Sequence, residues 1–374
     1  MERYVEDEYL PLVEESKKYQ GIIVSIAPHP CAHLTYHKDM REEIGVVRIK
    51  DKYCLFIDGV TADRLGYVKS DLLRVDVVKV IADTFKQAGL PVMTVDQLME
   101  AIKNDPAVWD LYAKGFTQGL NQCERPASTQ KCMQFKPQNI VELCAFVAAI
   151  RPGFKSMLQT FISRTPFQYG IKSLDELLRI DGMTGNSAIS SFLLFDEQIL
   201  RLMIAGGIPA AEAYSTIKAI KKKKKEKVMA EKEKFKKGFT GYLLDKENAE
   251  KKHAEEVSEK VWKIIEDSSS YLFCAAHAFA YACDSAYGAW LKAHYPYEFY
   301  VTMLKLYTEK GNKEKVTAII EEMRRYRGIT LKPGQWGEDN SDWYIDKEHN
   351  TISQSMSSVK FISKKAAKDL YKLS

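Results

Sequence analysis

The sequence predicts an α+β protein that is mostly helical: a small β-rich segment, a large helical region and a short C-terminal β-hairpin. In the first 75 residues, apolar and polar side chains alternate with a period of two, which is typical of half-buried strands. From there on, apolar residues recur at helical spacing. Alternation returns at residues 343–345 and 351–353, which predicts the hairpin.

Several short elements are expected in the first part. Residues 6–18 change from acidic to basic and predict a short helix. The apolar run at 21–25 predicts a buried strand, and the alternation at 45–50 and 53–58 predicts a β-hairpin. A further short strand should lead through residues 67–71.

Helices are expected along most of the remaining chain. The spacing of Thr94 and Gln97, and of Ser173 and Glu176, is typical of capping boxes that open helices. Residues 139–150 are almost wholly apolar and predict a buried helix that ends before a proline. Other helices are expected at 77–85, 196–205, 210–220, 226–237, 255–268, 277–293, 297–308 and 312–326.

Composition excludes several classes of protein. The chain has 374 residues, 45% hydrophobic and 28% charged, which is typical of a globular protein and not of a disordered or collagen-like one. No apolar run approaches the roughly 18 residues of a membrane-spanning helix, and the acidic start does not resemble a secretory signal, so we expect a cytoplasmic location. The seven cysteines include no C-x-x-C pair, and we expect reduced thiols, mostly in the core.

Positive charge is concentrated in one stretch although the net charge is only +5. Lysines crowd residues 218–237 and include a run of five at 221–225. Such a density can neutralise nucleic-acid phosphates. The interspersed glutamates fit a solvated helix with salt bridges equally well. Similarly, Arg151 before Pro152 could bind a phosphate bidentately or simply mark the end of a helix.

Each of two residue pairs has a spacing that places both side chains on one face of an expected strand or helix. Lys69 and Asp71 alternate along an expected strand. A carboxylate beside a lysine suits a magnesium and triphosphate centre, although a surface pair has the same spacing. His277 and Tyr281 are four residues apart on an expected helix and would line a pocket or pack in a core.

A group of four residues between positions 29 and 37 contains possible metal ligands. Imidazole and thiolate groups bind zinc well. The spacing matches no closed zinc site, which favours an ordinary polar loop. The cluster consists of His29, Cys31, His33 and His37.

The sequence also lacks G-x-x-x-x-G-K-[ST], G-x-G-x-x-G, G-x-S-x-G and H-E-x-x-H, so P-loop, dinucleotide-binding, α/β-hydrolase and zincin classes lose their usual support.

Taken in order, these patterns resemble the C-family replicative polymerases, the alpha subunits of bacterial DNA polymerase III. The residues around Asp71 resemble the palm segment that ends in the third catalytic aspartate, and residues 148–153 resemble the finger motif that ends in Arg-Pro-Gly. Residues 290–299 match the family's pattern nearly residue for residue. Further similar segments are 21–25, 120–124, 136–137, 195–200, 217–223, 273–281 and 357–362.

The resemblance implies a domain order and a function. Residues 1–75 would be the second palm segment, with the end of a thumb helix at 1–18; residues 76–330 would be the fingers, and residues 331–374 a hairpin leading to a helix-hairpin-helix region. The implied activity is template-directed DNA synthesis with two Mg²⁺ ions, acting on a DNA primer-template and deoxynucleoside triphosphates. The partners would be the N-terminal polymerase portion and other replisome subunits, with no membrane.

The resemblance also assigns roles to residues. Asp71 would be catalytic and a metal ligand. The phosphates and the nucleotide would be bound by Lys69, Arg151, Lys218, Lys222, Lys223, His277 and Tyr281. We expect Arg151 and Lys218 to converge on one phosphate pocket.

Departures from the family's pattern leave a second hypothesis open. The two other metal-binding aspartates, a PHP domain and most of the palm and thumb are expected upstream of Met1. Within the matched region, Ile217 replaces an arginine and residues 274–276 replace Asn-Lys-Ser. The chain alone is therefore expected to be inactive, and a non-catalytic DNA-binding or accessory remnant of a polymerase is the alternative.

Overall fold

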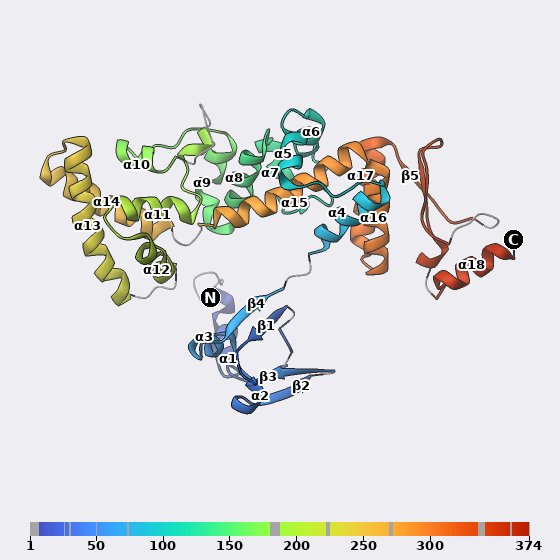
Figure 1. The fold of residues 1–374 in the computed structure, drawn as a ribbon, viewed down its shortest axis with the longest axis horizontal. Coiled ribbons are helices and arrows are strands. Elements are labelled where there is room, and N and C mark those ends of the chain that lie inside the picture. The colour runs from blue at the N-terminus through green and yellow to red at the C-terminus, as the bar shows by residue number, and fades with distance from the viewer. Residues whose placement is uncertain are drawn as a thin grey trace. The chain divides into compact units, whose positions relative to one another are not determined.

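The computed structural model describes residues 7–25, 27–29, 31–49, 51–72, 75–179, 188–221, 225–268, 272–335, 341–359 and 361–373 (Figure 1). The chain divides into two compact units, residues 1–75 and 76–374. Strands are short and helices predominate, so the predicted mostly helical α+β class is confirmed.

The described residues of unit 1 form two small antiparallel sheets. Strand β1 pairs with β4, so that Ala32 lies opposite Asp71, and β2 pairs with β3 in the predicted hairpin. The strand through residues 67–71 is confirmed as β4. The elements are η2 (Asp7–Tyr9), α1 (Leu10–Lys17), β1 (Ala32–Thr35), α2 (Met40–Glu43), β2 (Val46–Ile49), β3 (Lys52–Leu55), α3 (Gly59–Arg64) and β4 (Val68–Asp71).

The predicted buried strand at 21–25 is wrong. These residues lie outside the strands, and the exposed fractions of Ile23 and Val24 are 73% and 93%. A strand needs a neighbouring strand to satisfy its backbone N–H and C=O groups. Among the described residues, β1 to β4 pair with one another and give this segment no ladder partner.

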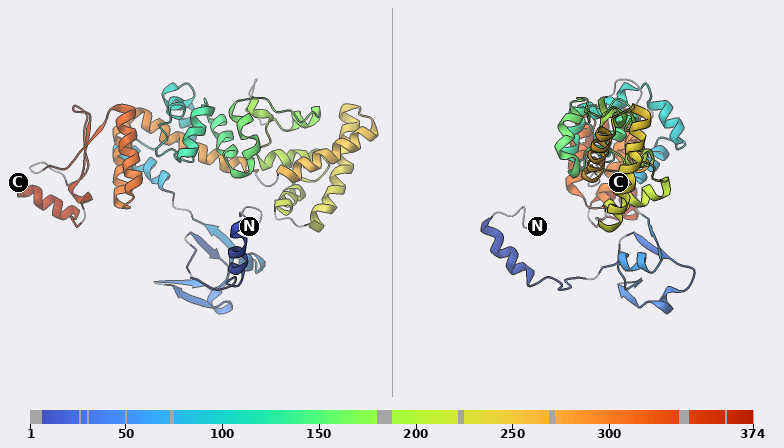
Figure 2. Two further views of the ribbon diagram at one scale, coloured as in Figure 1. Left: turned by 180° about the vertical axis from the view of Figure 1, so that it is seen from behind. Right: turned by 90° about the vertical axis from the view of Figure 1, so that its left-hand side faces the viewer.

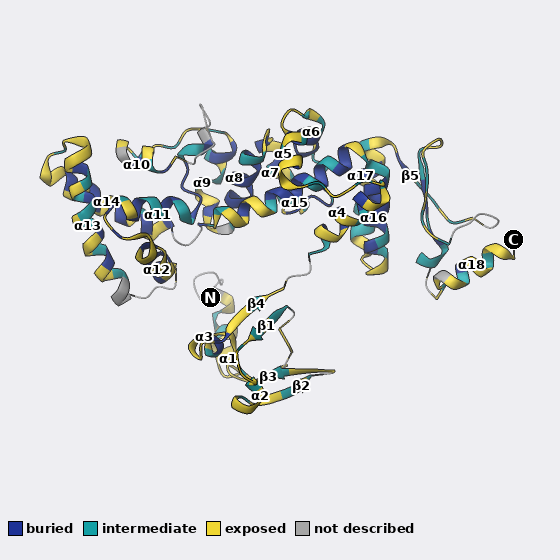
Figure 3. Cartoon of the chain, viewed as in Figure 1, coloured by how far each residue is buried: buried dark blue, intermediate teal, exposed yellow. Residues whose placement is uncertain are grey.

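Unit 1 has almost no core of its own, and its described ribbon is mostly exposed or intermediate in burial (Figure 3). Among its described residues, the buried hydrophobic side chains are Ala62 and Tyr67. Tyr67 packs edge-on against Tyr36, with 4.7 Å between ring centroids, and donates a hydrogen bond to Glu43. Many larger apolar side chains of this unit are exposed, namely Tyr9, Leu12, Tyr19, Ile22, Ile23, Val24, Val46, Tyr53, Phe56, Val60, Leu65, Val68 and Leu72.

Unit 2 is helical and closes with a small sheet. The predicted helices from 77 to 326 are present, and the one expected at 226–237 runs on to residue 247. The helices are α4 (Asp76–Gln87), α5 (Val95–Ile102), α6 (Pro106–Lys114), α7 (Pro126–Phe135), α8 (Ile140–Ala149), η3 (Pro152–Phe154), α9 (Lys155–Ile162), α10 (Lys172–Leu177), η4 (Ala188–Ser191), α11 (Asp196–Ala205), α12 (Ala210–Lys221), α13 (Lys225–Glu247), α14 (Lys251–Ser268), α15 (Ala275–His294), α16 (Pro296–Glu309) and α17 (Lys313–Arg327).

Helix α15 is the centre of the first hydrophobic cluster of unit 2. It packs against α4, α6, α8 and α16 (Figure 1). Alanines on the inner face of α15, at 278, 282, 286, 289 and 293, allow close approach of its neighbours. Four of the seven cysteines are buried, as expected, and all seven are free thiols.

The second hydrophobic cluster joins helices α10 to α14. Helices α13 and α14 lie side by side, as the views in Figure 2 show, and Phe235, Phe239 and Trp262 are fully buried between them and their neighbours. Gly238 lets α13 approach the turn after α11, because a Cβ atom there would lie 1.9 Å from the Gly206 carbonyl oxygen. This contact fixes the Lys-rich helix α13 on the cluster.

The two predicted capping boxes have different outcomes. Thr94 and Gln97 form the reciprocal box at the start of α5. The box at Ser173 is wrong, because α10 begins earlier and Ile171 is its N-cap residue. The Asp175 carboxylate accepts a hydrogen bond from the Tyr169 N–H, so this carboxylate stabilises the chain before the helix starts.

The C-terminal part carries the predicted hairpin with one extra strand. Strands β6 (Tyr344–Asp346) and β7 (Thr351–Ser353) are antiparallel, and β5 (Thr330–Lys332) joins β7 in parallel. A short turn, η5 (Met356–Ser358), and helix α18 (Lys364–Lys372) follow. In the described part of the chain, no helix has the length and apolar character needed to cross a membrane.

Candidate functional site

Arg151 lies on an aromatic platform at the end of α8. Its guanidinium carbon is 3.3 Å from the centroid of the Phe273 ring. Among the described residues, its buried Nε atom has no hydrogen-bond partner. Burial lowers the pKa of the guanidinium, and the nearby Tyr281 acts in the opposite sense. A half-buried cation with an unsatisfied hydrogen-bond donor is suited to bind an anion.

A backbone bridge places Phe273 beside the start of α11. Phe273 donates its N–H to the Leu194 carbonyl at 3.1 Å, and its own carbonyl accepts from Asp196 at 2.9 Å. The first turn of α15 is fixed by Glu197, whose carboxylate accepts the Ala275 N–H at 2.9 Å. A carboxylate at a helix N-terminus is favourable because it satisfies a free N–H group and complements the helix dipole.

His277 and Tyr281 lie on one face of α15, as their spacing predicted. Their ring centroids are 4.2 Å apart, and the ring of His277 lies nearly perpendicular to that of Phe273, with 5.0 Å between the centroids. His277 is exposed, whereas Tyr281 is half-buried. The rings therefore continue from the Arg151 platform along the surface of α15. We call Arg151, Phe273, His277 and Tyr281 the finger cluster.

The lysines predicted to bind phosphate have different surroundings. Lys218 is exposed, and its Nζ lies 4.4 Å from the Tyr214 ring centroid. One turn later, the Nζ of Lys221 lies 2.6 Å from the Asp196 carboxylate and donates to the Leu272 carbonyl at 3.3 Å. Lys221 therefore contacts the segment that carries Phe273. Lys222 and Lys223 lie outside the described residues, and convergence of Arg151 with Lys218 stays a prediction.

Further along α13, the lysines form the salt bridges that the glutamates suggested. Lys232 and Lys236 both pair with Glu259, at 2.6 and 2.8 Å. Lys234 pairs with Glu212 at 2.8 Å. Their positive charge is thus largely matched, and this part of the stretch behaves as a salt-bridged helix surface.

Lys69 and Asp71 share one face of β4. Lys69 Nζ lies 3.1 Å from Asp71 Oδ2, and the Asp71 side chain is 43% exposed at the end of the strand. Asp58, the last residue of the strand expected at 53–58, has a different role. It accepts the Thr61 N–H at 2.7 Å as the N-cap of α3, and this hydrogen bond lowers its pKa.

The structure adds two neighbours to Asp71 that the sequence did not connect with it. His29 Nδ1, Cys31 Sγ and an Asp71 carboxylate oxygen lie within 4.8 Å of one another. His33 and His37, the other members of the predicted polar loop, are not part of this group. The 40-residue separation between Cys31 and Asp71 hides the contact, which depends on the β1–β4 register.

A buried ion pair supports the chain just before residues 120–124, one of the segments that resemble the family. Lys292 is fully buried and donates to the carbonyls of Phe116 and Gln118 and to Glu322. Glu124 in turn accepts the Gly119 N–H at 2.9 Å and pairs with Lys315 at 2.6 Å. The Glu124 carboxylate therefore has structural partners. Phe273, Glu197 and Lys292 lie in segments that resemble the family, namely 273–281, 195–200 and 290–299. No local pattern assigned their roles, because these roles depend on contacts between distant segments.

Comparison with known proteins agrees with the motif pattern. Residues 76–241 match the family described as the bacterial DNA polymerase III alpha subunit finger domain. The chain is 27% identical over 369 residues to a DNA polymerase III subunit alpha of Aquifex aeolicus, covering 96% of this chain and 30% of that protein. It is 25% identical to the corresponding subunit of Caulobacter vibrioides, over 92% of this chain and 28% of that protein.

These matches confirm the resemblance to DNA polymerase III alpha subunits. A third relative, from Halalkalibacterium halodurans, is 24% identical over 99% of this chain and 32% of its own length. The chain thus spans roughly 30% of the length of these relatives. The finger cluster draws on residues inside and beyond the matched range, since Phe273, His277 and Tyr281 follow residue 241.

Proposed function

We propose that this chain, a relative of the bacterial DNA polymerase III alpha subunits, supplies the fingers and part of the palm of a template-directed DNA polymerase that acts in DNA replication in the cytoplasm. Residues 76–330 would be the fingers, residues 1–75 a palm segment, and residues 331–374 the approach to a helix-hairpin-helix region. The ligands would be a DNA primer-template and deoxynucleoside triphosphates, and the partners the N-terminal polymerase portion and other replisome subunits.

The observation that carries this proposal is the incomplete hydrogen bonding of the partly buried Arg151 side chain. Its guanidinium is stacked on Phe273, partly desolvated, and retains an unsatisfied Nε donor. An incoming triphosphate supplies the missing acceptor, and partial burial strengthens the charge–charge attraction. His277 and Tyr281 would line the nucleotide pocket beside this platform. Lys218, Lys222 and Lys223 would add phosphate contacts, and Lys69 would steady the phosphates near Asp71.

The thin core of unit 1 supports its assignment as part of a larger domain. In the described part of unit 1, the buried hydrophobic residues are Ala62 and Tyr67, and these two cannot offset the conformational entropy of ordering that part of the chain. The exposed apolar side chains of unit 1 would be covered by the remaining palm, which we expect outside the roughly 30% of the relatives' length that this chain spans. Polymerase activity would then require that portion.

The proposed reaction needs a divalent cation, and Mg²⁺ is the ion we expect in the complete polymerase. The described residues do not form a magnesium site by themselves. The groups close enough to share a cation with Asp71 are an imidazole nitrogen and a thiol sulfur, whereas Mg²⁺ prefers oxygen ligands. Further carboxylates would have to come from another segment.

Nucleotide binding by Arg151 variants tests the proposal. Fluorescence anisotropy can follow a labelled deoxynucleoside triphosphate added to the 374-residue chain with a primer-template that ends in a dideoxynucleotide. The Arg151→Lys variant keeps the charge but loses the planar fork, so we expect a Kd about tenfold higher.

Arg325→Lys is the matched control, because Arg325 also lies over an aromatic ring, that of Phe116 at 5.6 Å, but outside the finger cluster. Its Kd should be unchanged. Thermal unfolding of both variants separates loss of binding from loss of folding. Equal affinities of Arg151→Lys and the parent chain for the nucleotide would reject the pocket.

The second candidate function is a non-catalytic DNA-binding protein, favoured by the unusual neighbours of Asp71. Both candidates predict DNA binding that weakens with salt, at a log–log slope of about −0.9 per neutralised phosphate on duplex DNA. Replacing the lysines at 221–225 by glutamine should flatten this slope. Replacing Lys232, Lys234 and Lys236, which already pair with glutamates, should change it much less. Nucleotide binding that depends on Arg151 separates the polymerase from the accessory protein.

A further inference from the structure

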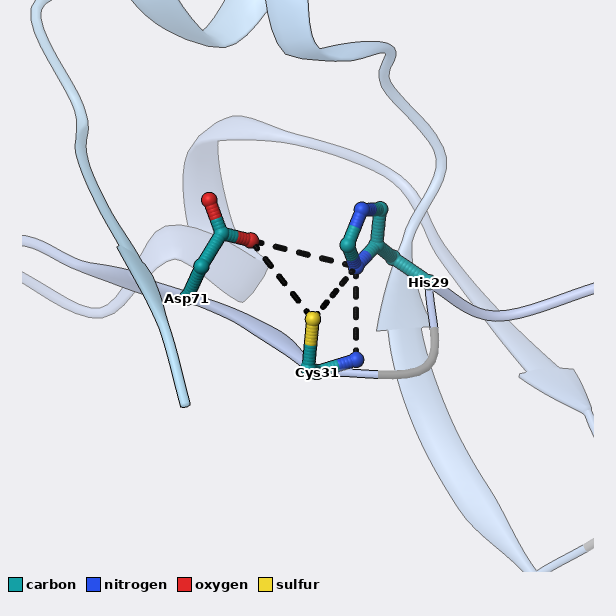
Figure 4. A group of neighbouring side chains, drawn as sticks. All are labelled: His29, Cys31 and Asp71. Atoms are coloured by element: carbon teal, nitrogen blue, oxygen red, sulfur yellow. Dashed lines mark hydrogen bonds and ion pairs between the residues drawn. The ribbon is translucent and has the colours of Figure 1, made fainter. Parts of the chain in front are cut away.

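Three possible metal ligands of different chemical types meet at the end of β4 in unit 1. Figure 4 shows the imidazole of His29, the thiol of Cys31 and the carboxylate of Asp71 pointing toward one another. Cys31 Sγ lies 3.7 Å from His29 Nδ1 and 3.8 Å from Asp71 Oδ1. His29 Nδ1 lies 4.0 Å from the same carboxylate oxygen.

The backbone of the β1–β4 pair sets this arrangement. The ladder places Ala32 opposite Asp71, and Leu72 extends it by donating its N–H to the Cys31 carbonyl at 2.9 Å. Cys31 is therefore held directly beside Asp71, although 40 residues separate them. His29 is brought back to the same point because its Nδ1 accepts the backbone N–H of Ala32 at 2.9 Å.

The spacing of the three atoms matches that of a metal site. A circle through atoms with these three separations has a radius of about 2.2 Å, worked from the distances above. Zinc bonds to nitrogen, oxygen and sulfur are about 2.0–2.3 Å long. One ion can thus contact all three atoms with little side-chain movement. A fourth position remains for water or a substrate oxygen, as in zinc sites with three protein ligands.

The geometry points to a binding site for a thiophilic divalent cation of the Zn²⁺ type, made by His29, Cys31 and Asp71. The mixed nitrogen, sulfur and oxygen set favours Zn²⁺ over Mg²⁺, which takes oxygen ligands. On binding, the Cys31 thiol, which now donates weakly to Asp71 Oδ1, releases its proton to solvent and binds as a thiolate.

Competing contacts do not prevent binding. The ion would replace the hydrogen bonds that His29 Nδ1 accepts from the N–H groups of Cys31 and Ala32. The net contribution of a neutral hydrogen bond to stability is small compared with the binding free energy of structural zinc in small peptides. Lys69 contacts the other oxygen of Asp71, Oδ2, at 3.1 Å and leaves Oδ1 directed at the thiol and the imidazole.

This assignment has a consequence for Asp71. The same carboxylate oxygen cannot serve a zinc-type site and a magnesium centre at once. Occupation by Zn²⁺ would therefore withdraw Asp71 from magnesium binding. The metal-binding claim stands without the polymerase proposal, because it rests on three side chains within unit 1.

Cobalt spectroscopy of the full 374-residue chain tests the site. Co²⁺ is added to the reduced protein, and the thiolate-to-cobalt charge-transfer band and the visible d–d bands are recorded. We expect one equivalent to bind with a thiolate band, and Zn²⁺ but not Mg²⁺ to displace it. Cys31→Ser should abolish the band. His29→Gln and Asp71→Asn should each weaken binding at least about a hundredfold, because even groups that only orient metal ligands contribute about ten- to a hundredfold.

Matched controls use the same substitutions elsewhere. Cys54→Ser removes the other thiol of unit 1, and Cys274→Ser removes the exposed thiol of unit 2. Neither should change the band, and nor should His33→Gln. Circular dichroism of each variant checks folding. A parent chain without a thiolate band, or a band that survives Cys31→Ser, would overturn the proposal.

Discussion

Replacing Lys292 by methionine should strongly destabilise unit 2. The Lys292 side chain is fully buried on α15, and its ammonium group donates to two backbone carbonyls and to Glu322 at 2.6 Å. Methionine fills a similar volume but leaves the Glu322 carboxylate buried without its cation. Breaking a buried pair from one side costs about 3–5 kcal/mol, so we expect a loss of that size in the free energy of unfolding.

The double variant Lys292→Met/Glu322→Leu separates the ion pair from its surroundings. Burial lowers the pKa of Lys292 more than Glu322 raises it, so the charge is held at a net desolvation cost. Removing both charges should therefore recover part of the loss. Recovery will be incomplete, because Glu322 also accepts from the Gln118 N–H at 2.8 Å and from Tyr300 at 3.0 Å. We expect the double variant to be at least about 2 kcal/mol more stable than the sum of the single effects implies.

Urea unfolding followed by circular dichroism measures these free energies, and hydrogen exchange locates the change. In Lys292→Met, the amides of residues 116–124 should exchange faster, because Lys292 holds two carbonyls of that segment. Lys114→Met is the control: it breaks an exposed pair with Asp110 and should cost under about 0.5 kcal/mol. A loss below about 1 kcal/mol in Lys292→Met, or additive single and double effects, would refute the reasoning.

Three further predictions concern other contacts. Arg164→Met removes a bidentate pair with Glu142, in which both oxygens accept at 2.7 Å, and should lower the free energy of unfolding by about 2–4 kcal/mol in urea titrations. Asp284→Asn should raise the urea midpoint of unfolding at pH 7. Burial raises the pKa of Asp284, so its ionised form destabilises the folded state at this pH. The gain in stability of the variant should disappear as the pH falls toward the usual aspartate pKa of about 4. In the 374-residue chain, amides of β1–β4 should exchange faster than those of α15 in hydrogen-exchange mass spectrometry, because unit 1 buries so few apolar side chains; equal protection would contradict this.

The helices were predictable because their signals are local. The apolar run at 139–150 gives α8, and the period of 3.6 gives α11 with the bounds expected. The strand predicted at 21–25 was wrong because a strand depends on a partner that local pattern does not reveal. The same dependence hid the neighbours of Asp71, since a register across two strands brings Cys31 to it.

The finger cluster was predictable only in part. The spacing of His277 and Tyr281 identified a shared helix face, and the Arg-Pro-Gly turn drew attention to Arg151. Phe273 was missed as the platform for Arg151, because its place depends on a backbone bridge to Phe195, 78 residues earlier. A sequence pattern fixes side chains within one element, whereas contacts between elements require the fold.

Lys292 and Arg151 show how hydrogen-bond satisfaction separates structural cations from binding cations. Lys292 is fully buried, and three protein acceptors match its three donors, so it has no capacity left for a ligand. Arg151 is only half-buried, and its stacked guanidinium retains a buried Nε without an acceptor among the described residues. Losing Lys292 should therefore lower stability in the absence of any ligand, whereas losing Arg151 should chiefly weaken anion binding. If Arg151→Lys lowered the unfolding free energy as much as Lys292→Met and left nucleotide affinity unchanged, the unsatisfied donor would have no binding role, and the finger cluster would be a packing feature of α8 and α15.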